Sequence, residues 1–95
     1  MNIVEKYGGT SVGTIEQIQA IALHAKHMKE QGHNLVIVAS AMGKTTNKLI
    51  ELAHSVTSNP NKRELDSLLS TGEQQTITLL AIAMNSIGLD TISLT

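Results

Sequence analysis

The segment Leu35-Val36-Ile37-Val38-Ala39 decides the fold, because it is a short, unbroken run of apolar and mostly β-branched residues. Such a run is typical of a strand in a parallel sheet that is covered on both faces. A second β-prone run, residues 2–7, lies at the start of the chain and ends at the glycine pair Gly8-Gly9. The architecture therefore depends on the segment that joins these two runs.

The joining segment has the pattern of an amphipathic helix. Thr14 can cap its N-terminus, and Gln17 three residues later completes a capping box. Gly32 stands where a helix commonly ends in a left-handed conformation. Between them, apolar residues recur at spacings of three and four: Ile15, Ile18, Ile21, Ala22, Ala25 and Met28. A strand, a helix and a strand in this order predict a βαβ unit with parallel strands.

The second half of the chain predicts further helices and one more strand. Residues 46–56 and 62–69 have helical periodicity, and Pro60 breaks the helix between them. We expect Gly72 to interrupt the second stretch, a new helix to begin at Glu73, and residues 90–95 to form a third strand. The expected fold is α/β, with three layers (αβα) and a mostly parallel sheet, of which residues 1–95 form an incomplete portion with three candidate strands.

The composition narrows the classes of function. Seven Lys and Arg against eight Asp and Glu give the 95 residues a formal net charge of −1, whereas proteins that bind nucleic acid need a basic excess. No apolar run approaches the ~20 residues that span a bilayer. The absence of cysteine excludes disulfides and thiolate-bound zinc, and the four histidines lack the grouping of metal ligands. We expect a cytoplasmic protein with no nucleic-acid partner, no membrane partner and no dedicated metal site.

Three polar turns are candidates for chemistry. Residues 6–13 hold paired glycines before a helix. The backbone amides of such a segment can bind phosphate oxygens, but the same pattern is also typical of an ordinary turn. Residues 40–47 follow the second strand; Val38 stands where a Walker A loop needs glycine, and the hydroxyls there either bind a ligand or cap a helix. In residues 70–75, the Glu73 carboxylate either contacts a cationic group of a ligand or stabilises the first turn of a helix through the helix dipole.

Taken in order, the three turns resemble the signatures of the aspartokinases, in the amino acid kinase family. Residues 6–12, KYGGTSV, match the opening motif K-[FY]-G-G-T-S-V, with Tyr7 in place of the commoner Phe. Residues 38–47, VASAMGKTTN, resemble V-x-S-A-M-G-x-[ST]-T-[ND]. Residues 68–74, LLSTGEQ, resemble L-L-[AS]-T-G-E-Q. The resemblance covers essentially the whole chain.

The resemblance implies transfer of the γ-phosphoryl group of MgATP to the side-chain carboxylate of L-aspartate. The product is 4-phospho-L-aspartate, at the start of the route to lysine, threonine and methionine. Phosphoryl transfer asks mainly for positioning and charge neutralisation. By the resemblance, Lys6 neutralises the transferring group, and Tyr7, Gly8 and Gly9 complete the ATP-binding turn, with Mg²⁺ bound to the nucleotide.

The same resemblance assigns three residues to aspartate. Ser40 and Thr46 hold it through their hydroxyls, and Glu73 pairs with its α-ammonium group, a charge-assisted contact. The alternatives are a related kinase for glutamate, acetylglutamate, carbamate or a nucleoside monophosphate, and a non-catalytic α/β interaction domain.

Aspartokinases are several times longer than this chain, because the rest of the kinase domain and regulatory ACT domains follow. We therefore expect residues 1–95 alone to lack kinase activity. The incomplete sheet and uncovered helix faces predict self-association, and the full-length protein is expected to be a homo-oligomer.

Overall fold

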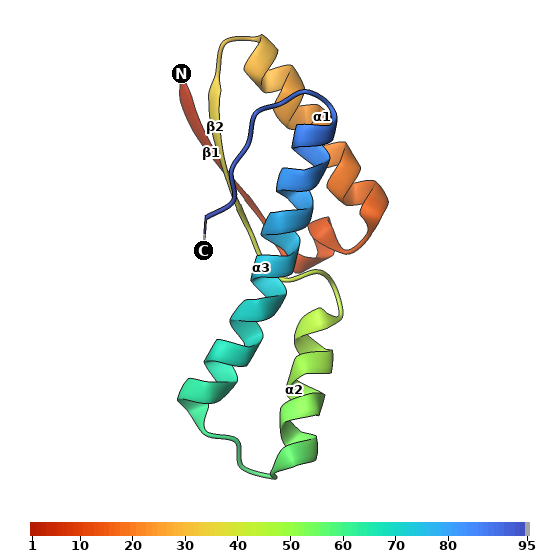
Figure 1. The fold of residues 1–95 in the computed structure, drawn as a ribbon, viewed down its shortest axis with the longest axis vertical. Coiled ribbons are helices and arrows are strands. Elements are labelled where there is room, and N and C mark those ends of the chain that lie inside the picture. Colours follow the sequence, from red (N-terminus) through yellow and green to blue (C-terminus); the bar gives the residue numbers. More distant parts are fainter. Residues whose placement is uncertain (95) are drawn as a thin grey trace.

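The computed structural model describes residues 1–94 and contains a two-stranded parallel sheet with three α-helices (Figure 1). Residues 2–7 and 34–39 form the two strands; Asn2 lies opposite Asn34 and Tyr7 opposite Ala39, so the predicted parallel pairing is confirmed. The elements in chain order are β1 (Asn2–Tyr7), a 3₁₀ turn η1 (Gly9–Val12), α1 (Ile15–Glu30), β2 (Asn34–Ala39), α2 (Thr45–Val56) and α3 (Lys62–Ser86).

Helix α1 begins and ends where its sequence signals predict. The hydroxyl of Thr14 accepts a hydrogen bond from the Gln17 amide at 3.2 Å, and the Gln17 side-chain oxygen accepts one from the Thr14 amide at 3.1 Å. This capping box satisfies amides that the first helical turn leaves unpaired. Gly32, with φ of +88°, follows the last turn in the left-handed conformation expected of a glycine there.

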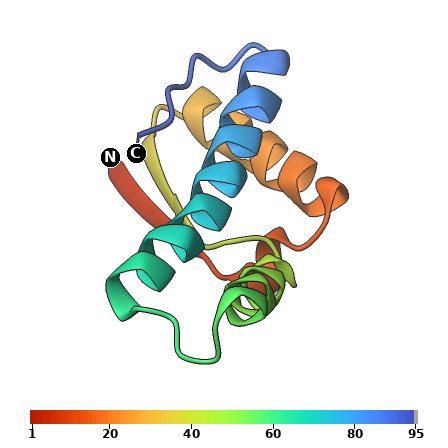
Figure 2. The same ribbon diagram turned by 60° about the horizontal axis from the view of Figure 1, so that its bottom comes forward.

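The core lies on one side of the sheet, where α1 and α3 pack together (Figures 1 and 2). Its buried side chains are Val12, Ile18, Ile21, Ala22, Ala25, Ala39, Leu80 and Met84. Alternate strand residues, such as Leu35 and Ile37, face this core, whereas Val36 and Val38 remain 58% and 49% exposed on the other face. Within residues 1–94 the sheet is thus covered on one face, not on the two that the apolar run of β2 predicts.

The predicted break at Gly72 is wrong, because α3 runs without interruption from Lys62 to Ser86. Gly72 is buried, and a Cβ added there would lie 3.0 Å from the Cβ of Ala41 and 3.1 Å from Cγ2 of Thr45. A glycine inside a helix costs only about 1 kcal/mol relative to alanine. Gly72 therefore serves close packing of α3 against the start of α2 rather than a break.

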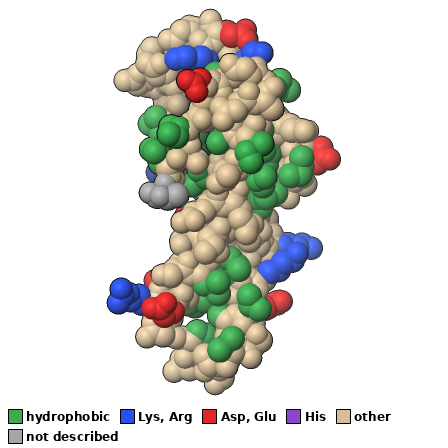
Figure 3. All heavy atoms as spheres, in the orientation of Figure 1, with side chains coloured by type: hydrophobic (Ala, Val, Ile, Leu, Met, Phe, Trp, Pro, Cys, Tyr) green, Lys and Arg blue, Asp and Glu red, His purple; other side chains and the backbone are tan. Residues whose placement is uncertain are grey.

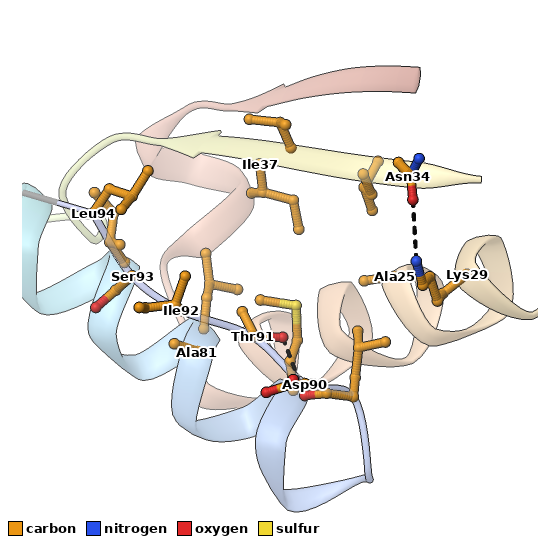
Figure 4. Close-up of a pocket in the computed structure, with 16 residues that line it drawn as sticks. Ala25, Lys29, Asn34, Ile37, Ala81, Asp90, Thr91, Ile92, Ser93 and Leu94 are labelled. Atoms are coloured by element: carbon orange, nitrogen blue, oxygen red, sulfur yellow. Dashed lines mark hydrogen bonds between the residues drawn. The ribbon is translucent and has the colours of Figure 1, made fainter. Parts of the chain in front are cut away.

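The predicted third strand is also wrong for residues 90–94, which are irregular, and Thr95 lies outside the described residues. The amide of Thr91 donates to the Asn85 side chain at 2.9 Å, and its hydroxyl donates to the Leu89 carbonyl at 3.1 Å. A groove of about 380 Å³ lies between β2, α3 and residues 89–94 (Figure 4). Hydrogen bonds to residues at and just after the end of α3 hold the start of this segment. Its sequence has β-propensity, but within the described residues it pairs with no strand.

Helix α2 and the first half of α3 form a hairpin that extends away from the sheet (Figure 1). No residue of α2 is buried, and Leu52 and Val56 are 58% and 84% exposed. Figure 3 shows hydrophobic side chains gathered over this part of the molecule. The hairpin is therefore held mainly by contacts between its own helices. None of the helices within residues 1–94 is long and apolar enough to cross a lipid bilayer.

Replacing Gly72 with alanine should lower the free energy of unfolding by about 1 kcal/mol. Overpacking against Ala41 and Thr45 costs roughly 1–3 kcal/mol, and the better helix propensity of alanine recovers about 1 kcal/mol of it. Gln75→Ala, at an exposed position of the same helix, is the control and should stay within about 0.5 kcal/mol. Urea unfolding measures both; a Gly72→Ala variant more stable than the parent would contradict the packing role.

Candidate functional site

The carboxyl ends of β1 and β2 point to the same edge of the sheet, and the turns that follow them are bonded to each other. The amide of Ser40 donates to the Tyr7 carbonyl at 3.0 Å, which extends the strand pairing by one residue. Beyond it, the amide of Gly43 donates to the Gly9 carbonyl, also at 3.0 Å. Ligands of open α/β sheets bind beyond this edge, so these turns are the first place to look for a site.

The two glycines of the first turn differ in their surroundings. A Cβ on Gly9 would lie 3.1 Å from the carbonyl oxygen of Ala41, so only glycine lets the two turns approach this closely. A Cβ on Gly8 would meet nothing within 4 Å. Gly9 is therefore required by the contact between the turns, whereas Gly8 has an open side where a ligand has room.

Residues 70–75, predicted as a turn, lie within the uninterrupted α3 and reach the same edge from that helix. Gly72 lies against Ala41 and Thr45, which belong to the turn after β2 and the start of α2. Glu73 follows directly and is exposed. The segments that carry the predicted site residues, far apart in sequence, thus converge at one edge.

The predicted side chains approach this edge from different directions. Lys6 is exposed and alternates with Glu5 and Tyr7, so it belongs to the uncovered face of the sheet. Ser40 is exposed and directly follows β2, which ends at Ala39. Glu73 comes from α3, on the covered side. The ion pair found within residues 1–94 joins His24 and Glu5, and no ion pair joins Lys6 to Glu73 there. The structure brings the segments together without placing these two charged groups in contact.

Thr46 is not used to cap α2. The helix begins at Thr45 with Lys44 at the N-cap position, and no side chain accepts a capping hydrogen bond. Thr46 is half-buried in the first turn. The interpretation of Thr45, Thr46 or Asn47 as the cap of this helix is therefore wrong, and the Thr46 hydroxyl makes no capping bond.

One polar cluster beside the site was missed by the sequence reasoning. The carboxylate of Glu5 accepts a hydrogen bond from the Tyr7 hydroxyl at 2.9 Å, and its other oxygen lies 2.9 Å from Nε2 of His24. Sequence periodicity placed His24 only on the polar face of α1, with no sign of a partner in β1. The bond to His24 is the main reason that the pKa of Glu5 is lowered, and burial, with the bond to Glu5, raises the pKa of Tyr7 to about 12.

Two hollows formed by the described residues lie away from this edge. The 380 Å³ groove is lined by the first half of β2, residues 34–37, and the second hollow lies on the first turns of α3, near Lys62 and Ser70. No group of three or more His, Cys, Asp or Glu side chains within residues 1–94 is arranged to hold a metal ion. The edge is thus an exposed surface built from backbone turns, with its charged groups around it.

Comparison with known proteins assigns the chain to a family. The sequence profile of the amino acid kinase family matches residues 1–95. The chain belongs to the amino acid kinase family. Among curated relatives, Aspartokinase 2 of Bacillus subtilis (strain 168) is 52% identical over 93 residues, and an aspartokinase of Geobacillus stearothermophilus is 50% identical over 93 residues. In both cases the match covers 98% of this chain and 23% of the relative.

A solved member of this family has the same arrangement of elements. The crystal structure of aspartate kinase from Synechocystis superposes with a TM-score of 0.89 at 52% sequence identity. It covers 93% of this chain, which spans 15% of that larger one. The α/β fold class expected from the sequence is confirmed; residues 1–94 contribute a parallel strand pair and the helices on one of its faces.

A matched pair of substitutions tests the packing of the glycine turn. Gly9→Ala should lower the free energy of unfolding by roughly 1–3 kcal/mol, because its Cβ meets a backbone oxygen that cannot rotate away. Gly8→Ala should change it by less than about 0.5 kcal/mol, since φ of −80° and ψ of 172° suit alanine and the space is open. Chemical denaturation measures both, and equal losses would contradict this geometry.

The stability of the fold should fall at high pH in a way that depends on Tyr7. Its pKa is about 12 in the folded chain, against about 10 in an unfolded one. The protonated hydroxyl therefore contributes its full stabilisation below pH ~10, and this is lost as pH rises toward ~12. Tyr7→Phe lacks this group, so its unfolding free energy should decline less steeply between pH ~10 and ~11.5. Parallel declines in urea titrations would show that Tyr7 is not linked to folding.

Proposed function

We propose that residues 1–95 are part of the catalytic domain of an aspartate kinase and build the region where MgATP and L-aspartate meet. The observation that carries the proposal is the convergence of the three aspartokinase-like segments, two turns and one stretch of α3, at one sheet edge. The Gly9–Gly43 hydrogen bond and the packing of Gly72 on Ala41 hold these segments together. About 50% identity to proteins named aspartokinase supports this substrate class.

On the nucleotide side, the first turn presents backbone amides and one cation. Gly8, open on its outer side, and Gly9 direct amides toward phosphate oxygens. Lys6 lies two residues before Gly8 at the end of β1 and neutralises charge on the transferring phosphoryl group. In this proposal Mg²⁺ enters with the nucleotide as part of the substrate, as it commonly does in phosphoryl transfer.

On the amino-acid side, the proposal gives aspartate three polar partners. Ser40 and Thr46 offer hydroxyls to hold it, and the exposed Glu73 carboxylate pairs with its α-ammonium group. A side-chain carboxylate oxygen of aspartate attacks the γ-phosphorus, and the bond from that phosphorus to the bridging oxygen of ADP breaks. The substrate itself is the nucleophile, so the protein needs only to position and neutralise.

Two alternatives predict different results. A kinase for glutamate, acetylglutamate, carbamate or a nucleoside monophosphate would use the same glycine turn with a different acceptor. An interaction domain would use none of these side chains. Thr46 together with residues 71–73 favours aspartate, because both match the aspartokinase signatures. The pathway step toward lysine, threonine and methionine and the cytoplasmic location belong to the same proposal.

A hybrid enzyme tests the proposed activity. Residues 1–95 replace the matching segment of Bacillus subtilis aspartokinase 2, and a coupled assay should detect ADP release that depends on aspartate. Lys6→Ala in this hybrid should lower kcat by about 100-fold, as loss of a transition-state charge donor does. Lys62→Ala, at the far end of the hairpin (Figure 1), should leave kcat within about twofold. A folded hybrid that is inactive, or that prefers another acceptor, would refute the proposal.

Glu73→Gln tests the acceptor directly. Removing the charge should raise the KM for aspartate about 10- to 100-fold, the usual loss for a hydrogen bond to a charged group, while the KM for ATP changes little. Glu51→Gln, an exposed carboxylate on α2, is the control and should alter neither value. An unchanged KM for aspartate would remove Glu73 from substrate binding.

A further inference from the structure

The strand that carries Lys6 ends in a polar network that the proposed mechanism does not use. The Glu5 carboxylate lies between two partners, with Oε1 2.9 Å from the Tyr7 hydroxyl and Oε2 2.9 Å from Nε2 of His24. Glu5 and Tyr7 are two residues apart on the core-facing side of β1, and His24 belongs to α1. The network therefore joins the C-terminal end of β1 to helix α1, just before the glycine pair.

Lys6 is held from both sides by this arrangement. It lies between Glu5 and Tyr7 in sequence, and its own side chain belongs to the opposite face. The backbone of Tyr7 is fixed as well, because its carbonyl accepts from the Ser40 amide at 3.0 Å. Gly8 follows immediately, and a Cβ added there would meet no atom within 4 Å. Tyr7 is thus the last residue whose side chain anchors the strand before the open turn.

We propose that Tyr7 and His24 are positioning residues that act through Glu5 to fix the end of β1, and with it Lys6 and the Gly8–Gly9 turn. A phenylalanine at position 7 would fill the same space but could not donate to Glu5. The proposal rests on the proposed function only for its effect on catalysis; the effect on the turn stands without it.

The protonation states of Tyr7 and Glu5 favour hydrogen bonds that persist at neutral pH. Burial and the bond to Glu5 raise the pKa of Tyr7 to about 12, so the hydroxyl keeps its proton and remains a donor at neutral pH. The Glu5 carboxylate is ionised there, since its pKa is lowered. Its side chain is 24% exposed, against 42% for His24, so water competes with the two bonds only partly. A charged acceptor with two donors makes stronger bonds than neutral pairs do.

Amide hydrogen exchange in the chain itself is the first test. Tyr7→Phe and His24→Gln should each speed exchange of the Ser40 and Gly43 amides about fivefold, the factor that loss of one hydrogen bond produces. The Gly32 amide, which is bonded to the Lys29 carbonyl at the end of α1, should exchange at its original rate. His27→Gln, an exposed histidine one turn further along α1, is the matched control and should change none of the three. Because His24 is a surface residue, its variant remains informative where Tyr7→Phe weakens folding.

The active hybrid gives a second measurement. Tyr7→Phe should lower kcat and raise the KM for ATP while the KM for aspartate is unchanged, and the double variant with His24→Gln should lose no more than the worse single variant, because both act through one carboxylate. Uniform acceleration of all amides, or none, would overturn the positioning role, as would additive kinetic losses. An inactive parent hybrid would instead refute the proposed function, and the exchange pattern would still decide this proposal.

Discussion

The parallel, in-register pairing of β1 with β2 is the interaction on which the rest of the structure depends. It sends both strands out at one edge, and the pairing continues into the turns through the Ser40–Tyr7 and Gly43–Gly9 hydrogen bonds. A shift of one residue would move every side chain of a strand to the other face. Lys6 would then point into the core and Tyr7 away from it, and the hydrogen bonds between the two turns could not form.

Small residues let a third segment join this pair. Gly9, Ala41 and Gly72 stand where the two turns and α3 approach each other, and a larger side chain at any of them would push the segments apart. Helix α2 has no buried residue of its own, so its position relative to the strands depends on this contact near Thr45. The site is therefore organised by backbone proximity, with its chemical groups carried on the segments that this proximity brings together.

Sequence signals predicted what is local and failed where distant partners decide. The extent of β1, the capping box of Thr14 and the turn at Gly32 follow from neighbouring residues, and all three are confirmed. The helix break predicted at Gly72 was wrong because a glycine is needed there for close contact with residues 41–45, which are 27 or more residues away in sequence. Residues 90–94 have strand propensity but no bonded neighbour among the described residues. The His24–Glu5 pair spans two elements, and helical periodicity carries no information on it.

The edge of the sheet is also where its two faces become accessible together. In the proposed site, a ligand that reaches Lys6 on the uncovered face, Ser40 after β2 and Glu73 on the side of α3 has to lie across the two turns. That position suits a phosphate between an ammonium group and a carboxylate-held amino acid. In residues 1–94, however, Lys6, Ser40 and Glu73 are exposed, and electrostatic stabilisation is strongest where water is excluded. If the proposed function holds, transfer should be efficient only where water is excluded from this edge. The chain spans 23% of the length of Aspartokinase 2 of Bacillus subtilis.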